Sequence, residues 1–164
     1  MSEVTGKENV QAMLLFHKPS KKPPLLNPVV LAYIGDAVFE LLVRQFLVSQ
    51  SNHKMHHLHK EATKIVSAKG QRKLLLEQWQ PLLTEEEADI VRRGRNTKSG
   101  APPKNADPAD YRQATALECL VGYLYYEGRV DRLEELFAHA VGTTKSSGSS
   151  AENTNVSDAS GGVE

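Results

Sequence analysis

The segment NPVVLAYIGDAVFELLVRQFLV (residues 27–48) predicts a long and strongly apolar helix. It opens with Asn27 and Pro28, a side-chain cap followed by a proline in the first turn, as is common where helices begin. Apolar side chains then recur at helical spacing, at Val30, Ile34, Val38, Leu41, Leu42 and Phe46. Because such a helix has to bury its apolar surface against other elements, we expect it to lie in a packed domain.

Helical signals continue through the centre of the chain. Thr84 and Glu87 have the spacing of a capping box, and Asp107 with Pro108 begins another apolar run. With Gly70 as a break between the first two, further helices are expected at residues 58–68, 71–79, 84–95, 107–126 and 130–140. Hardly any segment alternates with the period of two that strands need, so the sequence predicts an all-α fold.

Composition divides the chain into three parts. Residues 1–24 mix lysine with proline and are expected to form a flexible leader. Residues 25–141 are expected to fold as one domain, since a chain with 40% hydrophobic residues is ordinary for a globular protein. Residues 142–164 are rich in serine and glycine and have little apolar surface to bury, so we expect a disordered tail.

The overall charge excludes several classes of protein. Twenty Lys and Arg balance twenty Asp and Glu, which argues against a uniformly basic nucleic-acid coat or a polybasic membrane binder. The longest apolar segment, residues 29–48, contains three charged side chains, so it is unsuited to spanning a membrane. Cys119 is the single cysteine and can form no disulfide within the chain. We therefore expect a soluble cytoplasmic protein.

Net neutrality hides a strongly basic segment. Residues 90–105 carry five Lys and Arg and no acid, and Gly100, Pro102 and Pro103 indicate an exposed loop. Such a loop suits contacts to nucleic-acid phosphates, although a solvated loop that offsets the acids at residues 85–89 is an equally simple interpretation. The candidate RNA-binding residues are Arg95, Asn96, Lys98, Ser99, Lys104 and Asn105.

Two carboxylates stand in apolar surroundings, Asp36 within residues 32–39 and Glu118 within residues 114–122. A buried carboxylate is costly unless it is paired or binds a metal. If the two helices pack together, the acids converge, and two carboxylates with water suit Mg²⁺. Two simpler alternatives remain open: each acid faces solvent at the edge of the apolar stripe, or each pairs with an arginine such as Arg44 or Arg112.

Several segments resemble a known family. LAYIGDAVFE (residues 31–40) closely resembles the signature of the ribonuclease III catalytic domain, in the form carried by Mini-ribonuclease III, the bacterial variant without a separate double-stranded-RNA-binding domain. The resemblance continues, in order and spacing, through LHKEATKIVSAKGQ (58–71), RGRNTKSG (93–100), PKN (103–105) and ALECLVGYLY (116–125). It covers nearly the whole predicted domain.

This resemblance implies an all-helical, homodimeric endoribonuclease that cleaves double-stranded RNA with Mg²⁺ and matures the 23S ribosomal RNA precursor. It implies that Asp36 and Glu118 are the catalytic and metal-binding residues and that the basic loop contacts RNA. Ala32 and Thr115 stand where larger ribonuclease III enzymes have further acids, which leaves fewer protein ligands for metal. The competing hypothesis is a non-catalytic RNA-binding or ribosome-assembly module on the same scaffold.

Overall fold

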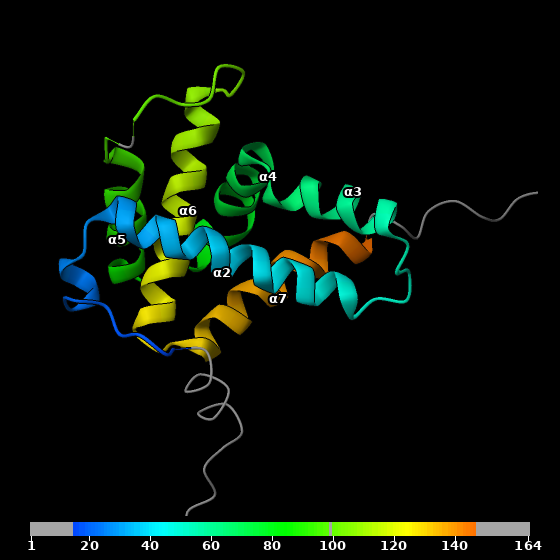
Figure 1. Cartoon of the computed structure of the whole chain (residues 1–164), viewed down its shortest axis with the longest axis horizontal. Coiled ribbons are helices and arrows are strands. Elements are labelled where there is room, and N and C mark those ends of the chain that lie inside the picture. The colour runs from blue at the N-terminus through cyan, green and yellow to red at the C-terminus, as the bar shows by residue number, and fades with distance from the viewer. Residues whose placement is uncertain (1–14, 99, 147–164) are drawn as a thin grey trace, which may run out of the picture.

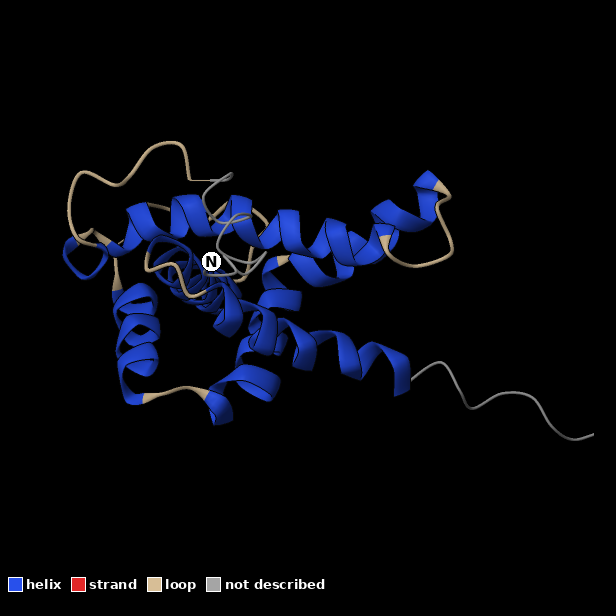
Figure 2. Ribbon diagram, turned by 90° about the horizontal axis from the view of Figure 1, so that it is seen from below, coloured by secondary structure: helices blue, strands red, loops and turns tan. Residues whose placement is uncertain are grey.

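Figure 1 shows the computed structural model of the chain, which describes residues 15–98 and 100–146. Within these ranges every regular element is a helix, and Figure 2 shows helices joined by loops without a strand, so the all-α prediction is confirmed. The elements are, in order, η1 (Pro23–Leu25), α2 (Pro28–Val48), α3 (Met55–Val66), α4 (Ala68–Lys73), η2 (Leu74–Trp79), η3 (Gln80–Leu82), α5 (Glu85–Asn96), α6 (Pro108–Tyr126) and α7 (Val130–Ser146).

The central helix is α6. Helix α2 crosses it, while α4 and α5 pack along its two sides (Figure 1). Between Ala114 and Leu124 every residue of α6 is buried except Glu118, which is partly exposed. The hydrophobic core therefore gathers around α6, and Glu118 is the one point in this stretch where the helix meets the surface.

Glycines allow α2 and α6 to approach each other closely. A Cβ atom on Gly35 would lie 1.7 Å from the carbonyl oxygen of Glu118, and one on Gly122 would lie 2.0 Å from the carbonyl oxygen of Leu31. Both distances are far inside van der Waals contact, so only glycine fits at either position. This backbone contact fixes the point at which the two long helices meet.

Three of the predicted helix starts, those after Asn27, Thr84 and Asp107, are confirmed. The side chain of Asn27 accepts a hydrogen bond from the backbone nitrogen of Val29, and that of Asp107 accepts one from Ala109. Thr84 and Glu87 form both hydrogen bonds of the capping box. These caps satisfy backbone donors that the first turn of a helix leaves unpaired.

The break predicted at Gly70 is wrong. Helix α3 begins at Met55, and the break falls at Ser67, whose hydroxyl accepts a hydrogen bond from the backbone nitrogen of Gly70. Gly70 itself lies inside α4, where a Cβ atom would be 2.1 Å from the carbonyl oxygen of Lys64. The glycine is needed for the tight corner between α3 and α4, and the serine begins the new helix.

Helix α7 is held to the rest of the domain by buried polar contacts. Glu87 is 1% exposed and accepts hydrogen bonds of 2.8 and 2.9 Å from the guanidinium of Arg132. The indole nitrogen of Trp79 donates to the carbonyl oxygen of Leu136 at 2.9 Å. The helix continues to Ser146, beyond the predicted end at residue 140.

Of the predicted leader and tail, residues 1–14 and 147–164 lie outside the described residues. Residues 23–24 begin η1, and residues 142–146 belong to α7. No helix in the described part of the chain is long and apolar enough to cross a membrane.

Candidate active site

The α2–α6 crossing brings Asp36 and Glu118 together. Asp36 directly follows Gly35, and Gly35 packs against the backbone of Glu118 itself. The two carboxyl groups lie near enough to interact electrostatically and to share a hydrogen bond. The position of the pair is therefore set by backbone packing between the two longest helices of the domain.

Glu118 is difficult to ionise in this setting. Burial, followed by the charge of Asp36, raises the pKa of the Glu118 carboxyl from its ordinary 4.5 to about 7. A hydrogen bond from Gln71 acts in the opposite direction, because it favours the ionised form. Negative charge is thus concentrated where it is poorly solvated, and a bound cation would relieve the repulsion.

Gln71, on α4, is the third polar side chain at this point. It is 2% exposed, and its Nε2 donates to Oε1 of Glu118 at 3.1 Å and to the carbonyl oxygen of Val66 at 3.0 Å. Sequence analysis did not single out this residue. The available signal was its spacing, since Gln71 precedes the apolar Leu74 and Leu75 by three and four residues and so shares their inward face.

Asp36 is exposed, so the expectation of an apolar environment is wrong for this acid. It lies about 100° around α2 from the inward-facing Gly35. Its neighbours Tyr33 and Ala37 are exposed as well, Tyr33 by 83%. The apolar residues near Asp36 in sequence therefore form a second, outward face of the helix and do not enclose the carboxylate.

The alternative in which an arginine neutralises the acids is not what the structure shows. Arg44 forms an ion pair with Glu40 one turn away on α2. Arg112 lies on a different face of α6 from Glu118, about 120° around the helix. For Asp36 the other alternative holds, because this acid faces solvent at the edge of the packed face.

The pair has few acidic or imidazole neighbours. Within the described ranges, no group of three or more His, Cys, Asp and Glu side chains is placed so that it could hold a metal ion. Ala32 is buried, and Thr115 is 6% exposed with its hydroxyl donating to the carbonyl oxygen of Tyr111 at 3.0 Å. The site thus offers two carboxylates together with the amide of Gln71.

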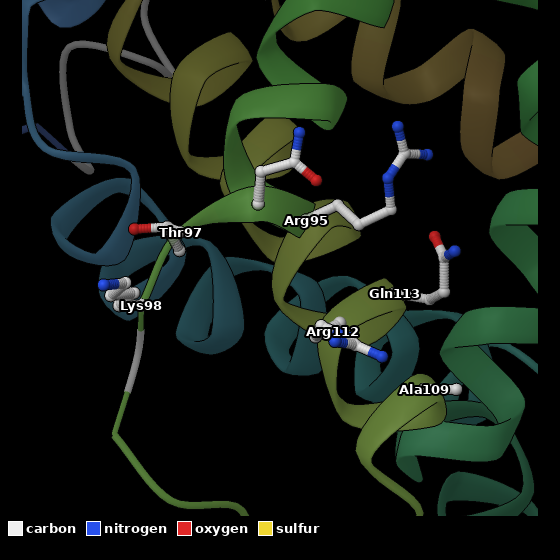
Figure 3. A pocket seen from close by; sticks show the side chains of 7 residues that line it. Arg95, Thr97, Lys98, Ala109, Arg112 and Gln113 are labelled. Atoms are coloured by element: carbon white, nitrogen blue, oxygen red, sulfur yellow. The ribbon is translucent and has the colours of Figure 1, made fainter.

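A basic hollow of about 460 Å³ lies between the end of α5 and the start of α6 (Figure 3). Arg95, Lys98 and Arg112 supply its positive charge, and no carboxylate lines it. In the part of the chain that the structure describes, none of these three cations forms an ion pair. The remaining lining residues are Asn96, Thr97, Ala109 and Gln113.

The predicted RNA-binding set is therefore divided. Arg95, Asn96 and Lys98 line the hollow, whereas Lys104 and Asn105 are exposed outside it and Ser99 lies outside the described residues. Sequence analysis missed Arg112 and Gln113 because they belong to α6, beyond the loop. The only sequence feature that could have indicated them is their position, one turn after the Asp107–Pro108 start of that helix.

Comparison with known proteins gives consistent matches. The model of the ribonuclease III domain matches residues 29–129. The chain is 48% identical to the Mini-ribonuclease 3 of Brevibacillus brevis over 74% of this chain and 90% of that protein. It is 45% identical to the Mini-ribonuclease 3 of Staphylococcus aureus over 68% of this chain and 84% of that protein.

A solved structure agrees with these matches. The crystal structure of a Fusobacterium nucleatum protein superposes with a TM-score of 0.65 and 27% identity, over 76% of this chain and 99% of that one. The helical fold and the domain match together define an endoribonuclease of the ribonuclease III class. The chain belongs to the ribonuclease III family, in its Mini-ribonuclease III branch.

The raised pKa of Glu118 predicts a pH-dependent stability in metal-free protein. The folded state binds this proton more tightly than the unfolded state, so the carboxylate lowers stability as pH rises from about 4.5 to about 7. Glu118→Gln removes the titration and keeps the contact with Gln71. In EDTA, the free energy of unfolding of Glu118→Gln relative to the unaltered protein should therefore rise between pH 4 and pH 8, by on the order of 3 kcal/mol.

Urea unfolding at a series of pH values measures this difference. Glu77→Gln, which replaces an exposed glutamate, is the control and should show no comparable trend. If the stability difference for Glu118→Gln stays constant across the pH range, the pKa of Glu118 is not raised by burial and by Asp36 as described.

Proposed function

We propose that this chain is a Mg²⁺-dependent endoribonuclease that hydrolyses phosphodiester bonds in double-stranded RNA and acts as a cytoplasmic homodimer. Its proposed substrate is the precursor of 23S ribosomal RNA, as the resemblance to Mini-ribonuclease III implies. The meeting of Asp36 and Glu118 at the α2–α6 crossing is the observation that carries this proposal. A protein that only binds RNA has no need of two mutually repelling acids.

The donor set at the crossing fits Mg²⁺. This ion is commonly bound through one or two carboxylates and completes its coordination with water and substrate phosphate. Asp36 and Glu118 are the residues that would hold it, and the repulsion that raises the pKa of Glu118 favours cation binding. When bound, Mg²⁺ neutralises charge on the scissile phosphate and makes water a stronger nucleophile.

The two acids have different positions and hence different roles. Asp36 is exposed and can face the RNA, whereas Glu118 is partly buried and held by Gln71. The neighbouring Cys119 is 1% exposed, and burial raises the pKa of its thiol to about 12, so it is a poor nucleophile at neutral pH. Direct attack by water, without a covalent enzyme intermediate, is the reaction that these residues support.

Removing either acid should abolish cleavage while RNA is still bound. Asp36→Asn and Glu118→Gln each remove one negative charge and change the volume little. We expect no Mg²⁺-dependent cleavage of a duplex RNA by either variant, in a gel assay with a structured ribosomal precursor. Undiminished cleavage by either variant would overturn the proposed site. If the unaltered protein binds duplex RNA without cutting it, the non-catalytic module is supported instead.

The basic hollow is the proposed contact for the RNA backbone. A-form RNA is recognised mainly through its phosphates and 2′-hydroxyls. Arg95, Lys98 and Arg112 line the hollow and no carboxylate lines it, so their charge is available to phosphate. The exposed Lys104 and Asn105 extend the same basic surface along the loop.

Loss of the hollow's charge should weaken RNA binding and reduce its dependence on salt. In the non-cleaving Asp36→Asn background, adding Lys98→Ala and Arg112→Ala should lower the slope of log affinity against log salt by about 2, as two phosphate contacts are lost. Fluorescence anisotropy with a labelled duplex at several salt concentrations measures this slope. Arg92→Ala is the matched control, because Arg92 pairs with Asp89. If Arg92→Ala lowers the slope as much as the substitutions in the hollow do, the proposed RNA contact in the hollow is contradicted.

The outward face of α2 supports the proposed homodimer. Val30, Tyr33, Leu41 and Val48 lie along one side of the helix and are 49%, 83%, 43% and 59% exposed. Large contiguous apolar patches on soluble monomers are uncommon and mark interaction sites. Asp36 lies beside this face, so a second copy packed there would place two acid pairs near a common twofold axis.

A charge on this face should disrupt the dimer. Leu41→Asp places a carboxylate in the proposed interface and should give monomers with reduced cleavage, as measured by sedimentation equilibrium and the gel assay. Leu82→Asp is the control, because Leu82 is similarly exposed at 37% but belongs to η3. A Leu41→Asp variant that sediments as the unaltered protein does would contradict the interface.

A further inference from the structure

Gln71 is buried in a way that is unfavourable for a glutamine. Its Nε2 has two acceptors, Val66 and Glu118, but its Oε1 is buried without a hydrogen-bond partner among the described residues. A buried acceptor left unpaired costs free energy, so the two hydrogen bonds of Nε2 have to offset the cost of placing this amide in the interior. What distinguishes the amide from an apolar side chain at this position is the donor that it offers to Val66 and Glu118.

The orientation of the amide follows from its neighbours. Both groups at Nε2, the Val66 carbonyl oxygen and Oε1 of Glu118, are acceptors, so the NH₂ end has to face them and the oxygen has to face away. Ser67 caps α4, and the close approach of Gly70 to the Lys64 carbonyl fixes the corner that precedes Gln71. The helix that carries Gln71 is thus fixed, and the Val66 carbonyl oxygen holds the donor itself.

The partner of this donor is free to rotate without it. The last torsion of a glutamate side chain has a broad distribution of angles, so burial does not by itself orient the Glu118 carboxylate. A bond of 3.1 Å from a fixed donor to Oε1 removes that freedom and leaves the other oxygen, Oε2, for other partners. The Asp36 carboxyl group is close enough to interact with this carboxylate.

We propose that Gln71 is a positioning residue, which orients the Glu118 carboxylate toward Asp36 so that the two acids together bind a divalent cation. The inference rests on the proposed function, in which that cation is Mg²⁺. Hydrogen bonds to metal-ligating groups commonly contribute a factor of about 10 to 100 in metal affinity or activity. Gln71 takes part through Glu118 and does not itself need to touch RNA.

Gln71→Met tests this role, because methionine is close to glutamine in length but has no donor. In EDTA the variant should remain folded with a lower melting temperature, because the Val66 carbonyl oxygen and Oε1 of Glu118 lose this donor. Its Kd for Mg²⁺, measured by calorimetry without RNA, should rise about 10- to 100-fold. At a fixed Mg²⁺ concentration, kcat should fall while KM for duplex RNA stays constant. Wild-type Mg²⁺ affinity in a folded Gln71→Met protein would overturn the proposal.

The controls separate this role from general stability. Gln50→Met replaces another partly buried glutamine, whose Nε2 donates to the carbonyl oxygen of Phe46 near the far end of α2, and should leave Mg²⁺ affinity unchanged. If Gln71→Met fails to fold, Gln71→Asn keeps an amide that is too short to reach both acceptors, and the same loss of affinity is expected.

A metal-free measurement distinguishes failure of this inference from failure of the proposed function. Crystal structures of the unaltered protein and of Gln71→Met in EDTA should show one orientation of the Glu118 carboxylate in the first and several in the second. An unchanged carboxylate in Gln71→Met would overturn the positioning role. If the unaltered protein neither binds Mg²⁺ nor cleaves RNA, the proposed function fails, and this comparison of carboxylates still decides the role of Gln71.

Discussion

The close contact between the backbones of α2 and α6 is the constraint on which the site depends. Gly35 and Gly122 remove the side chains that would hold the helices apart, so that a carbonyl oxygen of each helix occupies the place of a Cβ atom on the other. The contact lies at Glu118 and directly before Asp36, and it therefore joins the two acids through rigid elements and not through loops. Sites on helices are held more precisely than sites on flexible segments.

Sequence reasoning could predict those parts of the structure that have a local cause. Caps at Asn27, Thr84 and Asp107 and the spacing of apolar residues specify where helices form, and these predictions are confirmed. The prediction at Gly70 failed because glycine serves close packing as well as helix termination, and only the tertiary neighbour, the Lys64 carbonyl, distinguishes the two.

The candidate site shows the same limit. The two acids were visible because each interrupts an apolar run, and the family resemblance strengthened that signal. Gln71 and Arg112 do not stand out within an apolar run. Gln71 matters because it contacts Glu118, and Arg112 because it lies beside the end of α5, and both neighbours are distant in sequence. The sequence left open whether Asp36 is buried or exposed, since an apolar neighbourhood in sequence does not tell a buried helix from one with two apolar faces.

Helix α2 has three faces with different roles, arranged around its axis. Gly35 faces α6, Asp36 lies about 100° away, and the exposed face with Tyr33 and Leu41 lies about 200° away. The acid therefore stands between the core and the proposed interface, where it is anchored on one side and open on the other. A shift of one residue in the helix would rotate it by about 100° and place the carboxylate against α6. The glycine contact excludes that shift, because a larger side chain at the crossing would meet the Glu118 backbone. The same contact thus keeps both the acid and the apolar face exposed, as the proposed RNA cleavage and the proposed dimer require.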